Sequence, residues 1–235
     1  MKKLFAVAVL ALAPGIAAAA GGARLQVGLS QNNVAFGGAD GNLAGAYLGV
    51  SGVSRRLGGV GVRARLSYAV GGGGASLETL AVRAVAYPRQ GISPYLGLGV
   101  LDLSTLAGAT SVATSYAINT TTGVISPVTT TTALPPTSLV MGVGLVGLRA
   151  RYVVNPRLLL TAHAALGAGF GGSTTGLPPA AGSASQLATS LGVGMRYAMT
   201  RRLDAALTYT RTAIPVRGAT YRSGEVAIQV SALFH

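Results

Sequence analysis

Residues 137–172 decide how this chain folds, because they contain two long arms joined by a short turn. The first arm, Val140–Tyr152, reads VMGVGLVGLRARY; Val153–Arg157 (VVNPR) is the turn; and the second arm, Leu158–Phe170, reads LLLTAHAALGAGF. From Val146 onward, apolar side chains occupy every second position, and glycine, arginine, threonine or histidine occupies most positions between them. This repeat of two predicts β-strands, each about twice the usual globular length.

The apolar face of such a hairpin must be covered. A second sheet covers it in a soluble β-sandwich, whereas lipid covers it in a membrane barrel, whose other face looks into the lumen. Half of the 235 residues are hydrophobic and only 10% are charged. Beyond the N-terminus, no run reaches the roughly 18 unbroken apolar residues of a membrane helix. The absence of cysteine excludes disulfides and thiolate chemistry.

Residues 1–20 are predicted to be a cleaved signal peptide. Lys2 and Lys3 precede an apolar run, and small residues follow it up to Ala20. A membrane anchor is the alternative reading, but Pro14 and Gly15 interrupt the run. We therefore expect one domain, residues 21–235, in an exported protein.

The expected mature chain is basic. Without Lys2 and Lys3 it has sixteen basic residues, all arginine, against five acidic ones, a formal charge of +11. The arginines are dispersed along an exported chain, so we expect no nucleic-acid partner. Barrel interior, turn tips and lipid phosphates are better destinations for them.

Ten strands are predicted along the chain. They cover residues 24–32, 43–53, 60–70, 77–87, 93–104, 140–152, 158–170, 186–197, 203–210 and 225–234. The predicted long connections are residues 33–42, 71–76, 105–136, 171–185 and 213–221. The predicted short connections are residues 54–58, 88–92, 153–157 and 199–202. Strict alternation of long and short connections is typical of bacterial barrels, with long outer loops and short periplasmic turns.

Aromatic residues gather near the predicted strand ends, where two girdles of a membrane barrel would meet the lipid head groups. The predicted interfacial aromatics are Tyr68, Tyr87, Tyr95, Tyr152, Phe170, Tyr197, Tyr209 and Phe234. Their high strand propensity alone explains their presence but not this sorting.

The chain resembles small bacterial outer-membrane β-barrel proteins. The resemblance is carried by Arg151-Tyr152 before Arg157-Leu158, by Arg196-Tyr197 before Arg202-Leu203, and by the last strand ending at Phe234. It implies an all-β, transmembrane, antiparallel up-and-down barrel of about ten strands, or eight if two hairpins are miscounted. It further implies a bacterial outer-membrane location, contact with membrane lipids, and recognition of residues 225–234 by the barrel-assembly machinery. His235 after Phe234 departs from the usual aromatic end.

Alternation also predicts which polar side chains face the lumen. The candidates are Arg63, Arg65, Arg83, Arg149, Arg151, His163, Arg196, Asp204, Glu225 and Gln229. Six arginines exceed the two carboxylates, and buried charge needs compensation. The lumen is therefore wet, holds anions, or places some arginines at the periplasmic mouth.

These features predict a structural barrel with a narrow, passive, anion-preferring pore as a variant of that function. The alternative is a surface adhesion or recognition barrel that acts through its outer loops, especially the threonine-rich residues 105–136. We expect no enzyme, because no acid or nucleophile lies near His163 in the sequence. The scattered acids lack calcium-loop spacing, so we expect neither metal nor cofactor.

Overall fold

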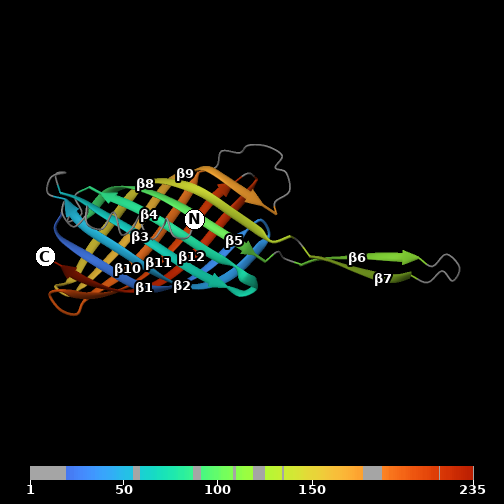
Figure 1. Ribbon diagram of the computed structural model, residues 1–235, viewed down its shortest axis with the longest axis horizontal. Helices are drawn as coiled ribbons and strands as arrows, with labels where there is room; N and C mark the ends of the chain where they lie inside the picture. Colours follow the sequence, from blue (N-terminus) through green and yellow to red (C-terminus); the bar gives the residue numbers. More distant parts are fainter. Residues whose placement is uncertain are drawn as a thin grey trace.

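The computed structural model is a closed antiparallel β-barrel (Figure 1). It describes residues 20–54, 59–86, 91–107, 110–118, 125–133, 135–176, 187–216 and 218–234. Around the barrel the strands follow the order β1-β12-β11-β10-β9-β8-β5-β4-β3-β2, and β2 returns to β1. The fold confirms the ten-stranded up-and-down barrel and excludes both the eight-stranded count and the soluble sandwich.

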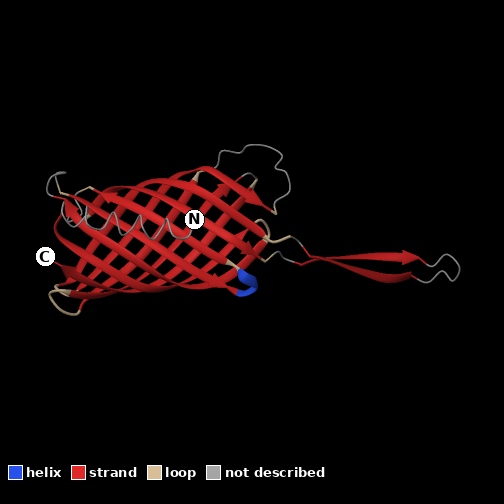
Figure 2. Cartoon of the chain, viewed as in Figure 1, coloured by secondary structure: helices blue, strands red, loops and turns tan. Residues whose placement is uncertain are grey.

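Strand bounds follow the predicted ones closely at the end with the short turns. The barrel strands are β1 (Ala20–Phe36), β2 (Ala39–Ser54), β3 (Val60–Gly71), β4 (Ser76–Val85), β5 (Ile92–Leu106), β8 (Thr137–Asn155), β9 (Leu158–Thr175), β10 (Ala188–Ala198), β11 (Leu203–Val216) and β12 (Ala219–Phe234). A single 3-10 turn, η1 (Gly72–Gly74), joins β3 to β4 and is drawn in blue in Figure 2. No helix in the described ranges is long and apolar enough to cross a membrane.

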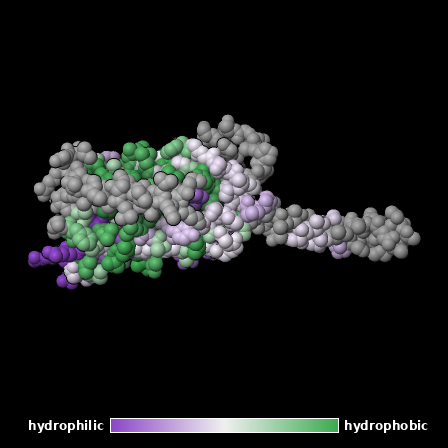
Figure 3. Space-filling view, viewed as in Figure 1, coloured by the Kyte–Doolittle hydropathy of each residue, from purple (hydrophilic) through white to green (hydrophobic). Residues whose placement is uncertain are grey.

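The predicted alternation separates the two faces of the barrel wall. Leu29 is 70% exposed and Ile228 62%, whereas the neighbouring Ser30 and Gln229 are each 6% exposed. Exposed large apolar side chains occur on every barrel strand except β4. In Figure 3 they gather on the barrel wall. They lie between a strongly hydrophilic end on the left and a paler end on the right. This apolar belt is what lipid covers in a membrane barrel.

Two predicted long connections, residues 33–42 and 213–221, are wrong, because the strands continue through most of each segment. Gly37 and Gly38 alone join β1 to β2, and only two residues separate β11 from β12, whereas residues 72–75 join β3 to β4 close to the predicted connection 71–76. Beyond the lipid, outward side chains need not be apolar, so the sequence alternation fades while backbone pairing continues. About 9–11 residues suffice to cross the hydrocarbon, and β8 has 19.

Residues 105–136 also differ from the predicted loop. β6 (Thr110–Ile118) and β7 (Ile125–Ala133) pair antiparallel and form a two-stranded ribbon outside the barrel sheet. The ribbon projects from one end of the barrel (Figure 1). Threonine's β-branched side chain favours extended backbone, so a threonine-rich segment paired with itself forms strands.

The end of the barrel that carries the ribbon is the outer end. The C-terminus and the short β8–β9 turn lie at the opposite end (Figure 1), and bacterial barrels keep their termini and short turns in the periplasm. The predicted signal peptide lies outside the described residues except for Ala20, where β1 begins.

The β1–β2 turn yields a first prediction. Gly38 has φ +84°, a left-handed conformation that costs an alanine about 1–2 kcal/mol. Gly38→Ala should therefore lower the urea midpoint of unfolding in detergent micelles. Gly72→Ala is the matched control, because an added Cβ there meets nothing within 4 Å. Equal midpoints for the two variants would contradict the strained turn.

Candidate functional site in the barrel interior

The outer third of the barrel is filled by apolar side chains that point inward. This apolar layer consists of Val34, Phe36, Ala39, Leu43, Ala69, Ala75, Leu77, Leu101, Leu103, Leu106, Leu139, Met141, Val143, Ala188, Ile214 and Tyr221. Apart from Ala75, which lies between η1 and β4, its members come from nine of the ten barrel strands, and Val34, Leu103 and Leu139 have no exposed surface. The sequence reasoning missed this layer, although Val34 and Phe36 simply continue the inward series of Gln26 and Ser30.

A contact across the barrel shows that the apolar layer spans the lumen. Phe36 lies on β1 and Thr137 on β8, which stand opposite each other in the ring of ten strands. The Thr137 hydroxyl nevertheless lies 3.5 Å from the Phe36 carbonyl oxygen and donates a hydrogen bond to it, and Thr137 is buried. The two walls therefore meet at this level.

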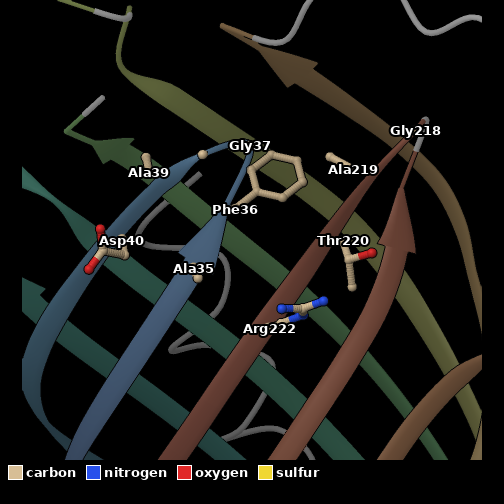
Figure 4. Close-up of a pocket in the computed structure, with 10 residues that line it drawn as sticks. Ala35, Phe36, Gly37, Ala39, Asp40, Gly218, Ala219, Thr220 and Arg222 are labelled. Atoms are coloured by element: carbon tan, nitrogen blue, oxygen red, sulfur yellow. The ribbon is translucent and has the colours of Figure 1, made fainter. Parts of the chain in front are cut away.

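A hollow of about 570 Å³ opens at the outer rim, between the β1–β2 and β11–β12 tips. Figure 4 shows the tips side by side, with the Phe36 ring between Gly37 and Ala219. Asp40 and Arg222 also line the hollow. Since Phe36 belongs to the apolar layer, this hollow ends where that layer begins.

Below the apolar layer the lumen is polar, and its first cluster joins β2, β3 and β12. The amide oxygen of Gln229 accepts hydrogen bonds from the Tyr47 hydroxyl at 2.9 Å and from the Arg63 guanidinium at 3.1 Å. Arg65 forms an ion pair with Glu225, and its guanidinium carbon lies 3.8 Å from the centre of the Tyr47 ring. Four of the predicted lumen residues are thus brought together.

A second cluster ties β1, β10 and β11 together through Asp204. One carboxylate oxygen of this 3%-exposed residue accepts hydrogen bonds from Arg24 and, at 2.6 Å, from Arg196. The sequence analysis predicted that Arg196 and Asp204 face the lumen but missed Arg24. Arg24 lies two positions before the inward Gln26 on the same strand, so the alternation could have placed it inside.

The third cluster, here called the arginine wall, comprises Arg83, Tyr95, Arg149, Arg151 and His163 on β4, β5, β8 and β9. The Arg83 guanidinium carbon lies 4.6 Å from the centre of the Tyr95 ring, and the Tyr95 and His163 rings meet edge-to-face with centroids 6.1 Å apart. Arg149 stands opposite His163 in the β8–β9 register. Within the described residues, no carboxylate forms an ion pair with an arginine of this wall.

Tyr95 corrects one of the predicted interfacial aromatics. It is 3% exposed and points into the lumen, because it shares the inward phase of Ser93 and Gly97 on β5. Nearness to a short turn does not decide which way a side chain points. Six others point outward and are at least 45% exposed: Tyr68, Tyr152, Phe170, Tyr197, Tyr209 and Phe234. Tyr87 lies outside the described residues.

Glycine makes room for the inward rings. A Cβ on Gly28 would lie 2.5 Å from the Tyr47 ring, and one on Gly192 would lie 2.2 Å from the His163 ring. The absence of these two side chains lets each ring pack against the adjacent wall. These inward glycines therefore accommodate large side chains in the lumen.

Comparison with known proteins identifies the fold. No family model and no curated protein matches the chain. Among solved structures, outer membrane protease OmpT from Escherichia coli aligns with a TM-score of 0.50 at 9% identity, over 91% of this chain and 97% of that one. The translocator domain of autotransporter NalP from Neisseria meningitidis aligns with a TM-score of 0.44 at 13% identity, over 97% of this chain and 95% of that one. Neisserial surface protein A aligns with a TM-score of 0.41 at 10% identity, over 89% of this chain and 96% of that one.

These identities show similarity of fold alone. The closed antiparallel ring and its apolar belt, together with that fold, define a membrane-embedded β-barrel. The chain therefore has the fold of the small outer-membrane β-barrels, with ten strands.

Asp204 gives the prediction for this site. Asp204→Asn should lower the free energy of unfolding by about 3 kcal/mol, because two inward arginines lose their common carboxylate. Asp102→Asn is the matched control: Asp102 faces outward from β5 opposite Glu78, and no ion pair is found for it among the described residues. Urea unfolding in micelles measures the free energy of unfolding of both variants. An equal loss of stability in Asp102→Asn and Asp204→Asn would contradict the bracing role of Asp204.

Proposed function

We propose that this protein is a structural outer-membrane barrel whose lumen is sealed at the outer end. The observation that supports the proposal is the apolar layer, in which β1 and β8 meet across the lumen. Ions do not pass a dry apolar plug readily, because they lose their hydration without compensation. This favours the structural reading over the anion-preferring pore.

The polar clusters support the same proposal from the other half of the barrel. Gln229 and Glu225 connect β12 with β2 and β3, and Asp204 connects β11 with β1 and β10. Both sets of contacts bridge the seam where the first and last strands of the chain pair. Side-chain contacts across the seam resist its opening.

We further propose that the barrel is not catalytic. His163 is the lumen histidine, and its ring packs against Tyr95 and the backbone of Gly192. No carboxylate in the described part of the chain is paired with it. In the same proposal, residues 1–20 are removed on export, and the assembly machinery reads residues 225–234 of β12.

Planar-bilayer recording tests the seal. The refolded protein, shown to be folded by its heat-modifiable gel mobility, should give no discrete current steps. Phe36→Ala combined with Leu139→Ala removes the side chains of two buried members of the apolar layer and should introduce steps. The control is Leu29→Ala combined with Leu166→Ala, two outward positions that are 70% and 55% exposed. Steps from the unaltered protein would refute the seal.

Surface recognition is the second candidate function, and the β6–β7 ribbon favours it. Among the described residues, β6 and β7 pair only with each other, so each leaves one strand edge free. Thr114, Thr129, Thr130 and Thr131 are exposed. A projecting ribbon with free edges and hydroxyl side chains can bind a partner by strand addition.

Removing the ribbon separates the two functions. Leu106 pairs with Thr137 at its base, so a short glycine–serine linker can replace residues 110–133. Because the ribbon lies outside the barrel sheet, the free energy of unfolding in urea should stay within about 0.5 kcal/mol of the original. Binding of whole bacteria to host or bacterial surfaces should fall to background if the ribbon is an adhesive element. Undiminished binding would eliminate the recognition role of the ribbon.

A further inference from the structure

Charge is distributed unevenly around the lumen. In the described part of the chain, seven arginines point inward: Arg24, Arg63, Arg65, Arg83, Arg149, Arg151 and Arg196. The two inward carboxylates, Asp204 and Glu225, lie on the adjacent strands β11 and β12. Both are engaged by arginines of β1, β3 and β10. The arginine wall on β4, β5, β8 and β9 is thus the part of the lumen without a negative charge.

The positive groups of this wall are close together and incompletely hydrogen-bonded. Arg83 lies over the Tyr95 ring, the Tyr95 ring meets His163, and Arg149 stands opposite His163 in the β8–β9 register, so these like charges share one stretch of wall. Nε of Arg151 and Nε2 of His163 are buried without a hydrogen-bond partner among the described residues. Donors and like charges collected in a partly buried space are costly unless an anion or water satisfies them.

We propose that the arginine wall binds one small oxyanion of the phosphate class. Guanidinium groups offer forked N–H donors that match the oxygens of such an anion. Arg83 and Arg149 would supply the principal donors, Arg151 additional charge, and the Tyr95 and His163 rings one side of the site. Neutralising the repulsion among these arginines makes the binding favourable.

The anion reaches the site from the periplasm. Arg149 and Arg151 lie six and four residues before Asn155, the last residue of β8 at the short β8–β9 turn, whereas the apolar layer closes the outer end. This dead-end geometry rests on the proposed seal, but the anion site itself does not. A barrel that conducts and still binds phosphate would overturn only the seal.

Isothermal titration of the folded barrel in zwitterionic detergent tests the site, with inorganic phosphate as the probe at constant ionic strength. We expect saturable binding of one phosphate per barrel, at least tenfold weaker in Arg149→Gln. Arg157→Gln, which removes an exposed arginine in the β8–β9 turn, should leave the affinity unchanged. Adding phosphate, but not equivalent chloride, should also raise the urea midpoint of the unaltered protein.

A second titration uses glycerol 3-phosphate, a soluble phosphate ester that resembles a lipid head group. If the natural ligand is free phosphate, the ester should bind more weakly; equal or tighter binding assigns the site to a phosphate monoester. The proposal is overturned if neither compound binds, or if Arg149→Gln and Arg157→Gln weaken binding equally. Unchanged heat-modifiable mobility in both variants separates lost binding from lost folding.

Discussion

The β1–β12 ladder is the contact on which the rest of this structure depends. It runs in continuous register from Ala23 opposite Phe234 to Ala35 opposite Arg222. Inside lipid, every backbone amide must find its partner within the protein, so a sheet with this apolar outer face is stable there only when closed. Closure also fixes which residues share the lumen, because it brings both ends of the chain to one seam.

The interior then follows from two different requirements along the barrel. Beyond the lipid, the wall no longer needs an apolar outside, and the inward positions become the hydrophobic core that stabilises the long strands. Within the membrane, arginine and aromatic side chains fill the space, and glycine at positions such as Gly28 and Gly192 makes room for the rings. The same alternation therefore runs through both halves of the barrel. Its inward residues are apolar towards the outer end, which closes it, and polar in the periplasmic half.

The positions of the two inward carboxylates divide the polar half of the lumen into a neutralised side and a positively charged side. Asp204 and Glu225 neutralise the arginines on their own side of the barrel and brace the seam. The opposite side keeps its positive charge, and Arg83, Arg149 and Arg151 remain close to the periplasmic mouth. Bracing and anion binding therefore occupy different walls, so a substitution in one set of arginines can be read separately from a substitution in the other.

Local pattern in the sequence determined the ten barrel strands, their antiparallel order and the outward belt, because side-chain alternation is a property of neighbouring residues. It also placed residues such as Arg65 and Glu225 on the inward face, but not in contact. Only the closed tertiary structure pairs Arg24 with Asp204, 180 positions apart, or sets Thr137 against Phe36 across the lumen. Those contacts depend on the register of strands distant in sequence. Only the tertiary structure likewise shows that some predicted connections are strand. Backbone pairing does not require the side chains to alternate, so these segments carry no strand pattern in the sequence.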